Sequence, residues 1–277
     1  MLASLLIVFR EVIEAGLIVG IVLSATRGIR RRGLWVGYGI AGGVAGACLV
    51  AGFAGEIAAW FEGAGQELFS AGILLLAVVM LTWHNVWMAS HGRAMVRELR
   101  EIGGAVAAGD RPPAALAIVC GVAVLREGSE VVLFLFGIAQ SGGASAPGMI
   151  AGGALGLLAG AAVSAVLYLG LLTIPLHRLF AVTSGLITLL AAGMASQAVL
   201  LIQQAGYLDI ATGTVWDTSW LLSDGALLGR LLHTLVGYTD QPNGAQLAVY
   251  GLTIATILGL MRLVAAGERA RRVTAAR

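Results

Sequence analysis

Two short charged motifs, each in the middle of an apolar stretch, constrain this sequence more than any other feature. The first reads Arg-Glu-Val-Ile-Glu over residues 10–14, and the second reads Arg-Glu-Gly-Ser-Glu over residues 126–130. Charged side chains at bilayer depth are costly and are retained mainly where a polar pathway needs them. The repetition of the motif predicts a polar site to which two parts of the chain contribute.

The composition restricts the chain to an integral membrane protein. Hydrophobic residues make up 58% of the 277 residues and charged residues 12%, which leaves too few polar side chains to cover a soluble domain. The 40 glycines indicate helices that approach each other closely through small residues. Cys48 and Cys120 lack the spacing of a thiolate metal site, and nothing indicates binding to nucleic acid.

Seven apolar runs of about 20 residues, the length needed to cross a hydrocarbon core of roughly 30 Å, predict seven transmembrane helices. We therefore expect an all-α membrane protein in the cell (inner) membrane. The runs lie near residues 2–25, 34–54, 68–90, 114–139, 148–171, 179–202 and 246–264. The first run carries charges where a cleaved signal peptide must be apolar, so we expect it to remain in the mature protein.

The links between these runs alternate in charge. Arginines follow the first, third, fifth and seventh runs, namely Arg27, Arg30, Arg31, Arg32, Arg93, Arg97, Arg100, Arg111, Arg178, Arg262, Arg269, Arg271, Arg272 and Arg277. The other links are acidic, uncharged, or carry a single Arg230. The positive-inside rule therefore predicts an outer N-terminus and an inner C-terminus. Residues 265–277 would form a basic cytoplasmic tail.

The first six runs repeat in sequence as two groups of three. Repeat 1 covers about residues 1–90 and repeat 2 about residues 114–202, and three crossings per unit would invert the second unit relative to the first. Glycines at four-residue spacing in the second and fifth runs predict close backbone contact with a neighbouring helix. The seventh run follows an outer segment, 203–245, in which residues 220–236 could form an interfacial helix. All of this belongs to one transmembrane domain, 1–264.

The two charged motifs are expected to form one shared site. At 100° per residue the three charged groups of each motif fall within one arc of a helix, near the middle of the membrane. Together they supply four carboxylates and two guanidinium groups, with a formal charge of minus two that needs a cation. Carboxylate oxygens suit small, highly charged metal ions. The residues are Arg10, Glu11, Glu14, Arg126, Glu127 and Glu130.

Several alternatives remain open from the residues alone. Each arginine could pair only with its own glutamates, which would give two self-contained helix braces. The glutamates could instead relay protons. An intramembrane metalloenzyme is a third alternative, although di-metal helix bundles use Glu-x-x-His motifs that neither motif here contains. A transporter of another hard or heavy divalent metal is the fourth.

At these residues the chain resembles the oxidase-dependent iron transporter family, the iron permeases of high-affinity iron uptake. That family carries an Arg-Glu-x-x-Glu motif in the first and fourth of seven membrane helices. The resemblance implies that Glu11, Glu14, Glu127 and Glu130 handle iron, with Arg10 and Arg126 in support. It also implies a ferric substrate that an extracytoplasmic oxidising or delivering partner supplies. The chain has no haem, copper or flavin motif of its own, so we expect no permanently bound cofactor.

Other polar residues are weaker candidates. His84 and Asn85 lie between tryptophans, which favours an interfacial anchor near the cytoplasmic end of the third run over a pathway ligand. Gln197 lies near the repeat position of His84, and we consider both residues as pathway candidates. Acidic residues on the outer side could concentrate cations there, namely Glu56, Glu62, Glu67, Asp209, Asp217 and Asp224. The arginines of residues 27–32 could contact anionic lipid.

Overall fold

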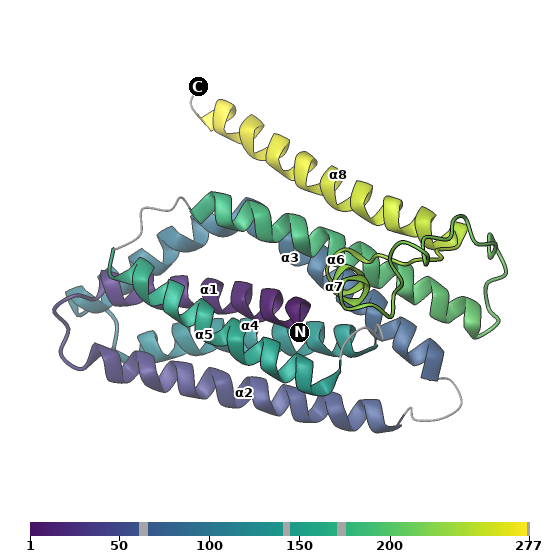
Figure 1. Ribbon diagram of the computed structural model, residues 1–277. Coiled ribbons are helices and arrows are strands. Elements are labelled where there is room, and N and C mark those ends of the chain that lie inside the picture. Colours follow the sequence, from purple (N-terminus) through teal and green to yellow (C-terminus); the bar gives the residue numbers. More distant parts are fainter. Residues whose placement is uncertain (61–65, 141–144, 171–175, 276–277) are drawn as a thin grey trace.

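The computed structural model describes residues 1–60, 66–140, 145–170 and 176–275, and within these ranges the chain is helical with no β-strand (Figure 1). The outer segment contains one isolated β-bridge, between Thr214 and Asn243. The helices are α1 Leu2–Ala25, α2 Arg32–Trp60, α3 Gln66–Ala108, α4 Ala114–Gln140, α5 Ala146–Tyr168, α6 Leu176–Gln204, α7 Leu227–Val236 and α8 Gly244–Ala275.

Five of these helices, α2, α3, α5, α6 and α8, contain stretches of at least 21 residues that are long and apolar enough to cross a membrane. Helices α1 and α4 have 24 and 27 residues, which is also a spanning length. Each of them carries one arginine and two glutamates near its middle. The two helices with the charged motifs are therefore the two whose composition least resembles a lipid-facing span.

Helices α1 and α5 pack backbone to backbone. A Cβ on Gly152 would lie 2.1 Å from the carbonyl oxygen of Met1, and a Cβ on Gly156 would lie 2.5 Å from that of Leu5. Only glycine allows this approach, as the spacing in the fifth run predicted. Because rising residue numbers on α5 meet rising numbers on α1, the two helices run parallel.

Helices α2 and α4 form a second pair of the same kind. A Cβ on Gly39 would lie 2.4 Å from the carbonyl oxygen of Ala117, and a Cβ on Gly43 would lie 2.7 Å from that of Gly121. These two helices also run parallel. Since α2 returns from α1 through the short link at residues 26–31, α1 and α4 run in opposite directions.

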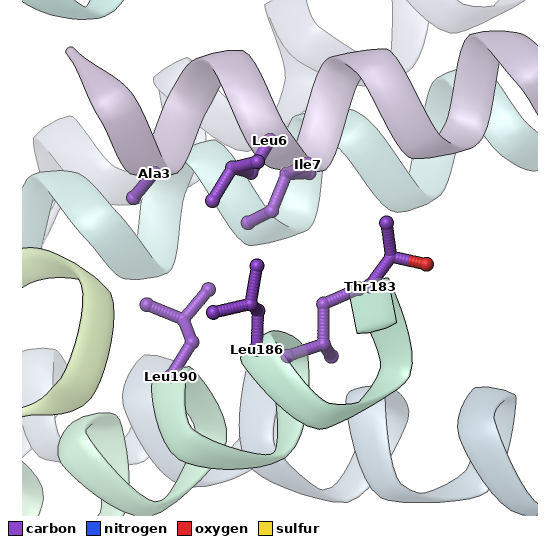
Figure 2. A pocket seen from close by; sticks show the side chains of 7 residues that line it. Ala3, Leu6, Ile7, Thr183, Leu186 and Leu190 are labelled. Carbon is purple, nitrogen blue, oxygen red and sulfur yellow. The ribbon is translucent and has the colours of Figure 1, made fainter. Parts of the chain in front are cut away.

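Helices α3 and α6 cover the side of this arrangement away from α2, and α8 packs on them (Figure 1). The main apolar core lies between α1, α3, α4, α6 and α8. Figure 2 shows one part of it, a small pocket where Ala3, Leu6 and Ile7 of α1 face Leu186 and Leu190 of α6. These side chains pack α1 against α6 through the face of α1 that is opposite the face in contact with α5.

Two helices are longer than the apolar runs from which they were predicted. Helix α3 continues to Ala108 instead of ending near residue 90, and α8 continues to Ala275 instead of ending near residue 264. The added residues are rich in Arg, Glu and Ala, which form helices well, and the charges of Arg and Glu are costly in lipid. An apolar run marks where lipid contact ends, whereas the hydrogen-bonded helix ends only at a residue that breaks it.

The segment of residues 203–245 packs mainly against α6. Its helix, α7, spans Leu227–Val236, within the stretch in which a short helix was predicted. It ends at Gly237, whose φ of 72° is left-handed and whose amide donates to the carbonyl of His233. Gly237 also lies against Gly193 of α6, where a Cβ on either glycine would meet the backbone of the other. This contact anchors the segment on α6.

Candidate metal centre

The first charged motif lies at the centre of α1 and is fully buried. Arg10 donates from Nη1 to Oε1 of Glu11 at 2.8 Å, and its Nη2 lies 2.9 Å from Oε1 of Glu14. The side chain of Arg10 is 2% exposed. Because Glu14 follows Arg10 by one helical turn, one guanidinium can hold both carboxylates.

The second motif lies at the centre of α4 and is arranged similarly but less tightly. Nε of Arg126 donates to Oε1 of Glu130 at 3.1 Å and lies 3.9 Å from Oε1 of Glu127. The guanidinium also stacks over the ring of Trp87, 4.4 Å from its centroid. The side chain of Arg126 is 37% exposed. The two arginines therefore differ mainly in burial.

His84 of α3 joins the two motifs. Its Nε2 lies 3.1 Å from Oε2 of Glu14, and its Nδ1 contacts Oε2 of Glu130. The imidazole therefore lies between the carboxylates of α1 and α4, and His84 is 2% exposed. The two motifs are not separate helix braces, because one side chain from a third helix touches both.

Four of these residues come close enough to hold a single ion. One ligand atom from each of Glu11, His84, Glu127 and Glu130 lies within 4.8 Å of the others, and all four residues are buried. Among the described residues, this is the one such group of His, Cys, Asp or Glu side chains. Oε2 of Glu11 and Oε2 of Glu127 have no hydrogen-bond partner within the described part of the chain. Burying a carboxylate oxygen without a partner is costly. These two oxygen atoms are therefore suited to bind a cation.

The position of His84 differs from the favoured sequence interpretation. The flanking tryptophans indicated an interfacial anchor, but His84 and Asn85 are both buried, each 2% exposed. The contacts with Glu14 and Glu130 account for the burial of His84, since both glutamates lie near the middle of their helices. The alignment of His84 with the depth of the two motifs is the signal that could have placed it in the site.

Gln197 does not reach this cluster. It is half-buried on α6 and lines a small pocket together with Ser196, His233 and Thr239, where α6 meets the outer segment. The pocket is polar and lies beside the Gly193–Gly237 contact described above. Gln197 therefore faces the outer segment, whereas His84 faces the carboxylates.

The acidic residues of the outer side do not gather into one group among the residues that the structure describes. Glu56, Glu67 and Asp209 are exposed at separate places, and Glu62 lies outside the described residues. Asp217 accepts hydrogen bonds from the hydroxyl and amide of Ser219, and these bonds hold the pKa of its carboxyl below the usual value. Asp217 therefore stabilises the turn at residues 217–219.

Asp224 also has a structural partner. Its Oδ1 accepts the amide of Asp240 at 3.2 Å, while its own amide donates to Oδ2 of Asp240 at 3.0 Å. Partial burial and then the neighbouring charge of Asp240 raise the pKa of the Asp224 carboxyl. This reciprocal pair joins the residues just before α7 to those just after it.

Comparison with known proteins places the sequence in a family. The model of the iron permease FTR1 family matches residues 1–271. The chain belongs to this iron permease family. The resemblance first noted at the two charged motifs is therefore confirmed for the whole chain, and the protein is a multi-pass membrane protein. No solved structure matches it.

Several curated relatives belong to the bacterial branch of the family. The ferrous iron permease EfeU of Escherichia coli O6:H1 (strain CFT073) is 33% identical over 255 residues, which are 90% of this chain and 91% of the relative. The protein of the same name from Yersinia pestis is 33% identical over 282 residues, covering 100% of this chain and 99% of the relative. That of Shigella sonnei is 32% identical over 254 residues.

Proposed function

We propose that this iron permease family member moves iron across the membrane through the cluster of Glu11, Glu14, His84, Glu127 and Glu130. The supporting observation is that ligand atoms of Glu11, His84, Glu127 and Glu130, from three helices, lie within 4.8 Å of one another. Glu14 adjoins this group through His84, at 3.1 Å. The arginines would hold the glutamates in place, because each contacts both glutamates of its own motif. Iron is the transported substrate in this proposal.

We further propose that the ion in the site is Fe²⁺, in place of the ferric ion that the sequence resemblance implied. The three relatives described above are named for ferrous iron, and the imidazole of His84 adds a nitrogen ligand of the kind that suits divalent iron. Four carboxylates and two guanidinium groups sum to minus two. A divalent ion beside a neutral imidazole would cancel that charge in a low-dielectric site.

The two helix pairs, α1 with α5 and α2 with α4, support the inverted repeat that the sequence predicted, because each pair joins one helix from each repeat. Residues 1 and 117 are related by the same offset of 116 as the two motifs, and so are residues 5 and 121. Their partners, Gly152 and Gly156 against Gly39 and Gly43, are likewise related by one offset. Equivalent contacts thus occur twice, with α1 and α5 in one and α4 and α2 in the other. We propose seven crossings, an outer N-terminus and alternating access about a two-fold axis in the membrane plane that relates the two repeats.

The other functions are less favoured by the geometry. Self-contained braces would leave His84 without a reason to touch both motifs. A catalytic metal centre of the di-metal bundle type would need Glu-x-x-His motifs, and neither charged motif has a histidine at that spacing. The ligands suit another divalent metal equally well. Competition between metal ions in an uptake experiment distinguishes such a metal from iron as the substrate. A delivering or oxidising partner outside the membrane stays a prediction.

The decisive experiment is uptake of radiolabelled iron into proteoliposomes that contain this protein alone. Iron is supplied separately as Fe²⁺ under reducing conditions and as chelated Fe³⁺, with Mn²⁺ and Zn²⁺ as competitors. We expect uptake of Fe²⁺ that Mn²⁺ reduces only in large excess. Uptake of Fe³⁺ alone would refute the ferrous proposal, and equal uptake of every divalent ion would refute selectivity for iron.

The role of His84 is tested in the same vesicles with His84→Gln, which gives α3 the amide that α6 has at Gln197. We expect the ratio of Fe²⁺ to Mn²⁺ uptake to fall about tenfold or more, because removing a nitrogen ligand leaves an oxygen site. A matched control is Gln197→Ala, which lies outside the cluster. An unchanged ratio in His84→Gln would remove the imidazole from the ligand set.

A further inference from the structure

A large cavity lies between the two parallel helix pairs, on the side of the cluster away from α3. Its volume is about 750 Å³, and α1, α2, α4 and α5 all line it. Its walls are almost entirely apolar, with Val44 and Cys48 on α2 and Leu157 and Ala161 on α5. Among the residues that the structure describes, the charged ones that line it are Glu11 and Glu127.

The cavity opens between two spanning helices that the rest of the protein leaves largely uncovered. Its two outer walls, α2 and α5, are spanning helices of which only 22% and 17% are buried, compared with 56% for α6. Val44 and Leu157, which line opposite walls, are 50% and 53% exposed. Because Glu11 and Glu127 lie near the middle of their helices, the floor of the cavity is close to the membrane midplane.

We propose that this cavity binds one acyl chain of a membrane phospholipid. Water is a poor occupant, because apolar cavities offer it too few hydrogen-bond partners. A phospholipid headgroup stays at the membrane surface, so only its hydrocarbon chain reaches this depth. The cavity is lined by small and branched apolar side chains, and it opens toward the lipid that supplies such chains.

The acyl chain has a definite effect on the carboxylates. It lies against Glu11 and Glu127 from the cavity side and keeps water out of the space next to them. Exclusion of water strengthens the attraction between a carboxylate and a cation. The lipid thus forms one wall of the ion site. Binding of the acyl chain depends only on the cavity. The proposal therefore does not depend on which cation the carboxylates bind.

The test uses a matched pair of substitutions on α5. Ala161 and Ala162 are neighbouring, exposed alanines, but only Ala161 lines the cavity. The protein is purified in mild detergent as wild type, Ala161→Trp and Ala162→Trp, and retained phospholipid is measured by native mass spectrometry. We expect one retained phospholipid per chain in the wild type and in Ala162→Trp, and its loss in Ala161→Trp.

A second pair on the opposite wall guards against misfolding of one variant. Cys48→Phe should also displace the lipid, whereas Leu49→Phe, which replaces an exposed residue outside the cavity, should not. Helix content measured by circular dichroism must match the wild type in every variant that is scored. A wild type without lipid, or equal retention in both members of each pair, would overturn the proposal. If the protein is a dimer, and Ala161→Trp dissociates the dimer without changing the bound lipid, a second copy of the protein occupies the cavity and the proposal is wrong.

Discussion

Replacing Glu130 by Gln tests the shared site at a residue that contacts both the arginine of its own motif and the histidine of α3. Glu130 accepts a hydrogen bond from Arg126 at 3.1 Å and contacts the imidazole of His84. Contacts to a charged group contribute about 1.5–3 kcal/mol each, and every 1.4 kcal/mol corresponds to about a tenfold change in affinity. Loss of the charge should therefore reduce iron uptake at least about tenfold.

The amount of protein in the membrane should stay unchanged, because the amide has nearly the same shape and is cheaper to bury than a carboxylate. Uptake of radiolabelled Fe²⁺ into proteoliposomes is measured per mole of incorporated protein. Glu14→Gln should show a similar loss, since Glu14 also contacts an arginine and His84. Glu67→Gln, at an exposed position on α3, is the matched control. Normal uptake by the Glu130 variant would remove this glutamate from the pathway and refute the shared site.

Three further predictions concern the arginines, the packing and the topology. Arg10→Lys should impair uptake more than Arg126→Lys, because the fully buried Arg10 holds two carboxylates with separate nitrogens, which an ammonium cannot do; equal activity of both variants and wild type would contradict this. Gly43→Leu should abolish the folded protein, seen by size-exclusion chromatography, whereas Gly42→Leu should not, since a Cβ at Gly42 meets nothing within 4 Å. In a chain without Cys48 and Cys120, Trp220→Cys should react with an impermeant thiol reagent added from outside, because Trp220 is 81% exposed; labelling only from inside would reverse the orientation.

The sequence was sufficient to predict the main helices and the convergence of the two motifs. Apolar length marks a membrane span, and a charged triplet inside such a span needs a partner at the same depth. The glycine faces were also predictable, because glycine at every fourth residue leaves one side of a helix flat. These features are local, because each depends on residues that are close together in the sequence. Neither the pairing of α1 with α5 nor that of α2 with α4 was predicted.

The position of His84 could not be obtained in the same way. Trp83 and Trp87 on either side of it are typical of a membrane interface, and Arg93 was expected to belong to a cytoplasmic link. In the structure α3 continues without a break through these residues. The missing information was where α3 lies relative to α1 and α4, and this depends on contacts between residues that are about 70 and 46 positions apart.

The pairing of α1 with α5 has a consequence for the order in which the chain enters the membrane. Helix α1 ends at Ala25, whereas its closest neighbour begins only at Ala146. While the intervening residues are being synthesised, three buried polar groups of α1 lack the histidine and carboxylates that later surround them. A ribosome-bound chain that stops before residue 146 therefore leaves α1 without its partner. Helix α1 becomes fixed in place only after more than half of the polypeptide has been made.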